Sequence, residues 1–112
     1  MNFGLSESIV LSIIETIKNF PQIEKVIIYG SRAKGNYKNG SDIDLTLIGN
    51  EVNLKISNKL EIALDDLLLP YTFDISIYHH ITNKELISHI NRVGIVFFEK
   101  QSENNLLKNP KN

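Results

Sequence analysis

The segment Tyr29-Gly-Ser-Arg-Ala-Lys-Gly-Asn-Tyr-Lys-Asn-Gly-Ser-Asp-Ile-Asp-Leu45 decides the fold of this 112-residue chain. It begins where the apolar run 26–29 ends, and such a run is typical of a buried strand. Gly30 allows the backbone to turn sharply and to approach a ligand closely, and Ser31 adds a hydroxyl group. Ten residues later the chain reaches Asp42 and Asp44. A tight turn followed by paired carboxylates favours a site for a nucleoside triphosphate and divalent metal ions.

The spacing of the acidic residues predicts that they face the same side of a sheet. Successive side chains of a strand point to opposite faces, so Asp42, Asp44 and Thr46 would share one face. The run Phe73-Asp74-Ile75-Ser76-Ile77 alternates in the same way. If the two strands are neighbours, their spacing of about 4.8 Å brings Asp74 beside the first pair. We therefore expect these three aspartates to be the catalytic and metal-binding residues.

The chemistry of such a cluster points to nucleotidyl transfer. Mg²⁺ prefers a few carboxylates together with substrate phosphates and waters, and two such ions, roughly 3.5–4 Å apart, would align the attacking and leaving oxygens. We expect two Mg²⁺ ions as cofactors and a nucleoside triphosphate as the substrate. The residues expected to bind the nucleotide phosphates surround the turn: Gly30, Ser31, Arg32, Lys34 and Ser41.

Composition limits the other possibilities. The formal net charge is −1, whereas proteins that bind long nucleic acids usually carry a basic stripe, so a long nucleic acid is disfavoured as substrate. The sequence has no apolar run long enough to cross a membrane and no evident secretory signal. The absence of cysteine excludes disulfides and thiolate metal sites and fits a cytoplasmic protein.

Hydrophobic periodicity predicts one α/β domain, a small mixed sheet backed by helices. Helical periods occur over 6–20, about 52–69 and 82–93, and strands are expected near 25–29, 42–48, 72–78 and 95–98. Thr82 and Glu85 have the spacing of a capping box. The catalytic domain would span 1–100, and 101–112 would form a flexible tail. The three histidines lack a useful spacing, and we expect them to be structural or surface residues.

The pattern Gly30-Ser31-x10-Asp42-x-Asp44 resembles the signature of the DNA-polymerase-β-like nucleotidyltransferases, and the chain is most similar to their minimal members, the MNT proteins. The resemblance covers nearly all of residues 5–100. It implies an antitoxin that transfers AMP from ATP to a tyrosine of a helical HEPN partner encoded nearby. It also implies that Ser31 binds phosphate and that the three aspartates hold metal. Many relatives carry a further acid three residues after the third carboxylate, where this chain has Ile77.

Two other functions fit the same residues. The chain could be the catalytic half of a two-subunit enzyme that modifies a small molecule, as aminoglycoside nucleotidyltransferases do. It could also neutralise a partner by contact alone. A chain of 112 residues has room for one modest core, so in each case the acceptor pocket or target lies on another molecule.

Overall fold

Four strands and the helices around them form the part of the chain that the computed structural model describes, residues 2–101. In chain order the elements are α1 (Glu7–Ile17), β1 (Lys25–Tyr29), α2 (Gly30–Lys34), β2 (Ile43–Ile48), α3 (Leu54–Asp65), β3 (Phe73–Ile77), the 3-10 helix η1 (Tyr78–His80), α4 (Lys84–Val93) and β4 (Ile95–Glu99). The expected tail at 101–112 lies, except for Gln101, outside the described residues. The proposed domain boundary near residue 100 stays a prediction.

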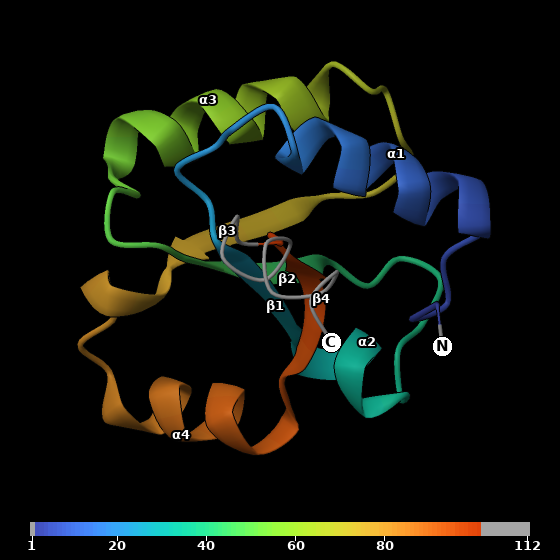
Figure 1. The fold of residues 1–112 in the computed structure, drawn as a ribbon. Helices are drawn as coiled ribbons and strands as arrows, with labels where there is room; N and C mark the ends of the chain where they lie inside the picture. Colours follow the sequence, from blue (N-terminus) through green and yellow to red (C-terminus); the bar gives the residue numbers. More distant parts are fainter. Residues whose placement is uncertain (1, 102–112) are drawn as a thin grey trace, which may run out of the picture.

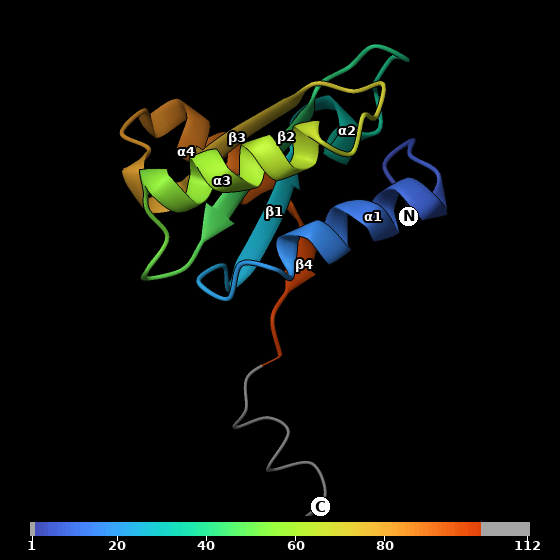
Figure 2. The ribbon, with the colours of Figure 1, turned by 90° about the horizontal axis from the view of Figure 1, so that it is seen from above.

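The strands make one mixed sheet in the order β3-β2-β1-β4. β1 runs antiparallel to both β2 and β4, and β2 runs parallel to β3. Helices α1 and α3 lie side by side over one face of the sheet, while α4 lies against the opposite face (Figures 1 and 2). The predicted α/β architecture, a small mixed sheet backed by helices, is confirmed.

The hydrophobic core lies between the sheet and the layer formed by α1 and α3. Ile13 of α1, Leu60 of α3 and Leu45 of β2 are fully buried there. Their burial follows from the periods in the sequence, because residues three or four apart share a helix face and alternate residues share a strand face. The same alternation turns Asp44 and Thr46 toward the opposite face, where α4 packs. The acids are therefore separated from the main core by the sheet itself.

The ends of the helices differ in detail from the expectations. The N-cap of α4 is Asn83, whose Oδ1 accepts hydrogen bonds from the N–H groups of Glu85 and Leu86, so the capping box expected at Thr82 is wrong. Thr82 and Asn83 are both residue types that cap helices. Asn83 is the cap because α4 begins at the next residue, Lys84. Helices α1 and α3 are also shorter than the helices predicted over 6–20 and about 52–69. The apolar residues that follow Ile17 and Asp65 pack against the core from turns rather than from helix. Within residues 2–101, no helix has the length and apolar character needed to span a membrane.

Candidate active site

Two of the three expected acids stand side by side on neighbouring strands. β2 and β3 are parallel, and their register pairs Asp44 directly with Asp74. Asp42 lies immediately before β2, where Ile43 begins the ladder by donating its N–H to the Thr72 carbonyl at 2.9 Å. Asp44 is half-buried, and Asp42 and Asp74 are exposed. The two strands that carry Asp44 and Asp74 are thus neighbours, as the prediction required, and the acids lie near the start of both strands.

The close approach of the acids changes the ionisation of Asp44. Burial of its carboxyl group, followed by the negative charges of Asp74 and Asp42, raises the pKa of Asp44 from 3.8 to about 6. Each cause disfavours the charged form, since burial removes water and like charges repel. A cation bound among these carboxylates would offset the repulsion between them and so lower the pKa of Asp44 again. A cation that binds beside these acids would therefore be attracted by their negative charges and would offset their mutual repulsion.

Gly30 brings the turn that opens α2 against this cluster. Its φ is +73°, and an added Cβ would collide with Oδ2 of Asp44. Both features require glycine, because a side chain is strained at positive φ and here would also meet a carboxylate. The preceding residue, Tyr29, pairs with Asp44 in the antiparallel register of β1 and β2. The turn and the acids are therefore held in one place by the sheet.

The short helix α2 begins at this turn. Backbone N–H groups in the first turn of a helix have no intrahelical partner, so Ser31 presents a donor as well as its hydroxyl group. Ser31 is half-buried, and Lys34 is exposed in the last turn of α2. Gly35 ends the helix in the left-handed conformation with φ +90°. Phosphate binding by Ser31 and Lys34 stays a prediction, and their placement beside the turn agrees with it.

Arg32 differs from its expected role. Its side chain is only 2% exposed, and its guanidinium group donates to the backbone carbonyls of Ser41 and Phe3. A phosphate contact would need this charge at the surface, so we no longer count Arg32 among the phosphate-binding residues. Arginine is suited to such burial because its planar group binds several acceptors and is weakly hydrated.

Ser41 also has a structural role that the sequence did not reveal. Its Oγ accepts a hydrogen bond from the N–H of Lys38 at 2.8 Å, which closes the turn around Asn39 and Gly40. Its carbonyl accepts from Arg32. Ser41 therefore shapes the loop that delivers Asp42, and its contact with a nucleotide stays a prediction.

A layer of polar side chains lies behind the acids, and the sequence analysis placed only Thr46 of this layer. The Tyr29 hydroxyl lies 3.5 Å from Oγ of Ser76, and Thr46, fully buried, directs Oγ1 toward the Ser76 carbonyl at 3.5 Å. Burial, together with the charges of Asp74 and Asp44, raises the pKa of Tyr29 despite its hydrogen bond with Ser76. Tyr29 pairs with Asp44 and shares its face of the sheet. The alternation along the strand 25–29 could therefore have predicted that Tyr29 lies near the acids.

The histidines agree with their expected structural or surface roles. The ring of His89 on α4 meets the Tyr29 ring edge-on, with centroids 6.1 Å apart. His79 and His80 are exposed on η1 and contact each other. Ile77, found where relatives carry an acid, is buried in the core. None of these four residues adds a carboxylate to the cluster formed by Asp42, Asp44 and Asp74.

The donor set fits a divalent cation that shares its ligands with a nucleotide. Among residues 2–101, no three acidic, histidine or cysteine side chains form a complete cluster of metal ligands. Mg²⁺ does not need one, because it retains waters and binds substrate phosphates alongside one or two carboxylates. Asp44, with its neighbours Asp42 and Asp74, supplies hard oxygen ligands of that kind. The residues present therefore fit the metal that the sequence pattern predicts.

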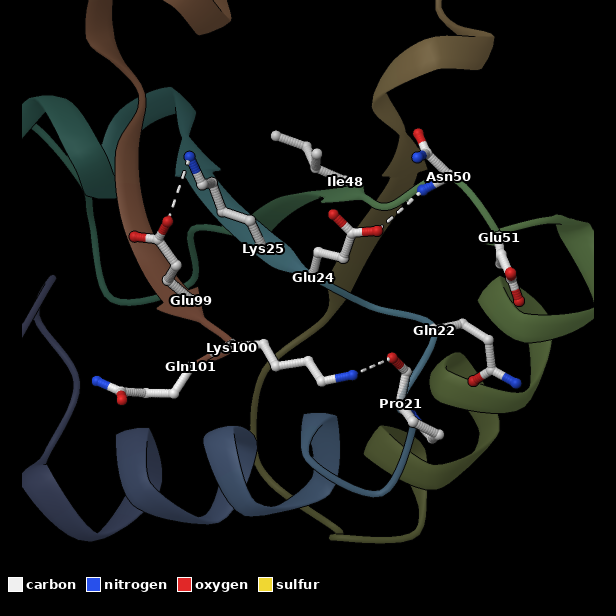
Figure 3. A pocket seen from close by; sticks show the side chains of 10 residues that line it. All are labelled: Pro21, Gln22, Glu24, Lys25, Ile48, Asn50, Glu51, Glu99, Lys100 and Gln101. Carbon is white, nitrogen blue, oxygen red and sulfur yellow. Dashed lines mark hydrogen bonds and ion pairs between the residues drawn. The ribbon is translucent and has the colours of Figure 1, made fainter. Parts of the chain in front are cut away.

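A large hollow of the described chain lies elsewhere. It is an open depression of about 1060 Å³ at the opposite end of β1, lined by residues that include Glu24, Lys25, Glu51, Glu99 and Lys100 (Figure 3). Its walls carry charges of both signs, and two of them, Lys25 and Glu99, approach each other at 3.7 Å. None of the predicted site residues lines it. The acids instead lie near the start of the parallel strands β2 and β3.

Comparison with known proteins identifies the family. Residues 12–103 match the family model described as polymerase beta, nucleotidyltransferase. The match covers most of the chain, so the chain belongs to the polymerase beta nucleotidyltransferase family, and it is an enzyme of the nucleotidyltransferase class. Comparison with curated protein sequences gives no significant match.

Solved structures share the same fold. A chain from a toxin–antitoxin complex with AMP-PNP has a TM-score of 0.65 at 18% identity, over 95% of this chain and 83% of that one. A tri-AMPylated HEPN toxin in complex with its MNT antitoxin, from Shewanella oneidensis, gives 0.63 at 16% identity, over 91% and 79%. A structure assigned to a minimal nucleotidyltransferase gives 0.64 at 22% identity, over 85% and 95%. At these identities the likeness establishes the fold alone, and it is the nucleotidyltransferase fold that the sequence predicted.

Proposed function

We propose that this chain transfers AMP from ATP to a tyrosine hydroxyl group on a helical HEPN-type partner, and so acts as an antitoxin. The observation that carries the proposal is the pairing of Asp44 with Asp74, beside Asp42 and against the Gly30 turn. This is an arrangement for holding a triphosphate with metal ions next to an acceptor. The similar solved structures include a tri-AMPylated HEPN toxin in complex with its MNT antitoxin, which supports the choice of partner.

The reaction forms a bond between the acceptor oxygen and the α-phosphorus of ATP and breaks the bond to the β-phosphate oxygen, so pyrophosphate leaves. Two Mg²⁺ ions held by Asp42, Asp44 and Asp74 would neutralise the phosphate charge and orient the reacting oxygens. Gly30 lets the backbone approach the phosphates, and Ser31 donates to them. Asp74, exposed on the edge strand β3, would accept the proton of the acceptor hydroxyl. Catalysis of this kind depends on positioning and charge neutralisation.

The openness of the site supports an acceptor on another protein. Asp42 and Asp74 are exposed, and the hollow near Glu24 is too far along the sheet to hold an acceptor for them. The formal net charge of −1 favours a free nucleotide over a long nucleic acid. Because the proposed substrate is ATP, we also propose a cytoplasmic location.

Intact-mass spectrometry of the partner tests the proposal. The chain and the HEPN-type protein encoded beside it would be purified together and incubated with ATP and Mg²⁺. We expect the partner to gain the mass of one adenylate group or a multiple of it. The double variant Asp42→Asn with Asp44→Asn should keep the complex and lose the gain, whereas Glu61→Gln, an exposed change on α3, should behave like the wild type.

Each contrary result identifies one of the other two functions. If the partner stays unmodified yet is still neutralised, the chain acts by contact alone. If a small molecule such as an aminoglycoside is adenylylated instead, the chain is the catalytic half of a small-molecule enzyme. Either outcome would overturn the proposed acceptor.

A further inference from the structure

Arg32 is the most completely buried charged side chain among the described residues, at 2% exposure. Its Nε and Nη2 both donate to the carbonyl oxygen of Ser41, at 3.2 and 3.0 Å, and its Nη1 donates to the carbonyl oxygen of Phe3 at 3.0 Å. Three of its nitrogen atoms therefore bind backbone acceptors. These acceptors come from two segments that are distant from each other in the sequence.

Two aromatic rings hold the same guanidinium group. Its central carbon lies 5.3 Å from the ring centre of Tyr37 and 5.0 Å from that of Tyr71, which is within the range of cation–π attraction. In the part of the chain that the structure describes, no carboxylate forms an ion pair with Arg32. A buried charge without a counter-ion is expensive. A neutral side chain could fill the same space at lower cost, so the directional hydrogen bonds explain why arginine is suited to this place.

The contact with Phe3 ties the N-terminal segment 2–5 to the loop before β2. Phe3 has a φ of +61° and Gly4 a φ of +76°, and positive φ is uncommon for a bulky residue such as phenylalanine. A Cβ at Gly4 would collide with the ring of Tyr37, so the segment packs closely on the residues that surround Arg32. Strained backbone of this kind persists only where surrounding contacts hold it. Arg32 is one of those contacts.

The contact with Ser41 has a consequence for the active site. The carbonyl of Ser41 and the amide nitrogen of Asp42 belong to one planar peptide unit, so fixing the oxygen also fixes the start of the Asp42 backbone. On its other side, Ile43 is held by its hydrogen bond to Thr72. Asp42 is exposed and lies outside the strand, so these two anchors set the direction in which its carboxylate leaves the backbone.

We propose that Arg32 is a positioning residue for catalysis, which holds Asp42 in place through the Ser41 carbonyl while touching neither nucleotide nor metal. The proposal rests on the proposed function, since it takes Asp42 to be a ligand of the metal–nucleotide complex. Lysine at this position would keep the charge, but it would lose the fork that binds two segments at once. Glutamine would keep donor groups without burying a charge.

A double-mutant cycle tests the proposal through binding. The dissociation constant of Mg²⁺–ATP would be measured by calorimetry for Arg32→Lys and Arg32→Gln, each with Asp42 intact and with Asp42→Asn. We expect each change at Arg32 to weaken binding about tenfold alone and less than about twofold beside Asp42→Asn, because coupled residues show interaction energies that independent residues lack. Arg92, exposed on α4, supplies the matched controls Arg92→Lys and Arg92→Gln, which should leave binding unchanged.

The outcomes separate this proposal from the proposed function. Equal weakening in both Asp42 backgrounds, unchanged binding, or loss of folding in both variants by thermal unfolding would each overturn the positioning role. A wild-type chain that shows the expected cycle but leaves its partner unmodified would overturn the proposed acceptor and uphold the role of Arg32.

Discussion

Replacing Asp44 with asparagine should stabilise the metal-free domain at neutral pH. The change removes a carboxylate that burial and the charges of Asp74 and Asp42 make unfavourable. The rise of its pKa from 3.8 to about 6, at about 1.36 kcal/mol per pKa unit, gives an upper limit of about 3 kcal/mol. Because the carboxyl group is only partly buried, water screens much of this repulsion, and we expect a gain of about 1 kcal/mol. For a domain of this size, that gain raises Tm by about 4 °C.

The gain should depend on pH with a definite sign. The folded-state pKa of Asp44 lies above the unfolded value, so the unfolded chain loses this proton first as the pH rises. Below about pH 4 the carboxyl group is protonated in both states and contributes no repulsion. Between that pH and about 6 the free energy of unfolding of the wild type falls, and above it the full cost of the charge is present. Asp44→Asn should therefore gain most at pH 8 and nothing near pH 4.

Thermal unfolding in EDTA at several pH values measures this difference, with Glu61→Gln on α3 as the control for loss of an exposed charge. A Tm gain for Asp44→Asn that is equal at pH 4 and pH 8 would refute the electrostatic reasoning. So would a variant less stable than the wild type at pH 8, since it would show that the carboxylate stabilises the fold through a contact rather than destabilising it by repulsion.

Two further expectations concern the nucleotide. Calorimetry should show much tighter binding of ATP with Mg²⁺ than in EDTA, because the carboxylates repel an uncompensated triphosphate, and equal affinities would count against the site. Gly30→Val should abolish pyrophosphate release, because the branched side chain meets Asp44 and resists positive φ. Ser31→Ala should reduce release less, by about 1.5–3 kcal/mol for one hydrogen bond to a charged group, since the backbone N–H remains. Near-normal turnover of Gly30→Val would show that the turn does not hold the phosphates.

The main features of the site could be predicted because they follow from short periods in the sequence. The two-residue period of strands put Asp44 on one face of β2 and Asp74 on the matching face of β3, whereas Asp42, expected in the same strand, lies just before it. The prediction assumed that these two strands are neighbours, and the structure shows that β2 and β3 do pair in parallel. The burial of Leu45 and Leu60 likewise follows from strand and helix periods.

The role of Arg32 could not be predicted, because its partners carry no signal in the sequence. It binds the carbonyls of Phe3 and Ser41, and any residue type presents a carbonyl. Its aromatic neighbours Tyr37 and Tyr71 meet only after the chain has folded. Beside Lys34 and a phosphate-binding turn, a basic residue therefore looked like a phosphate ligand. The cap of α4 shows the same limit on a smaller scale, since Thr82 and Asn83 are both capping residues.

A crystal structure with Mg²⁺ and α,β-methylene ATP, whose α–β bridge cannot be cleaved by transfer, tests the proposed active site most directly. We predict metal density contacting the carboxylates of Asp42 and Asp44, with Asp74 beside it and the triphosphate lying over Gly30 and Ser31. Nucleotide bound elsewhere, for example in the hollow lined by Glu24 and Lys100, with no metal among the three aspartates, would contradict the proposed site.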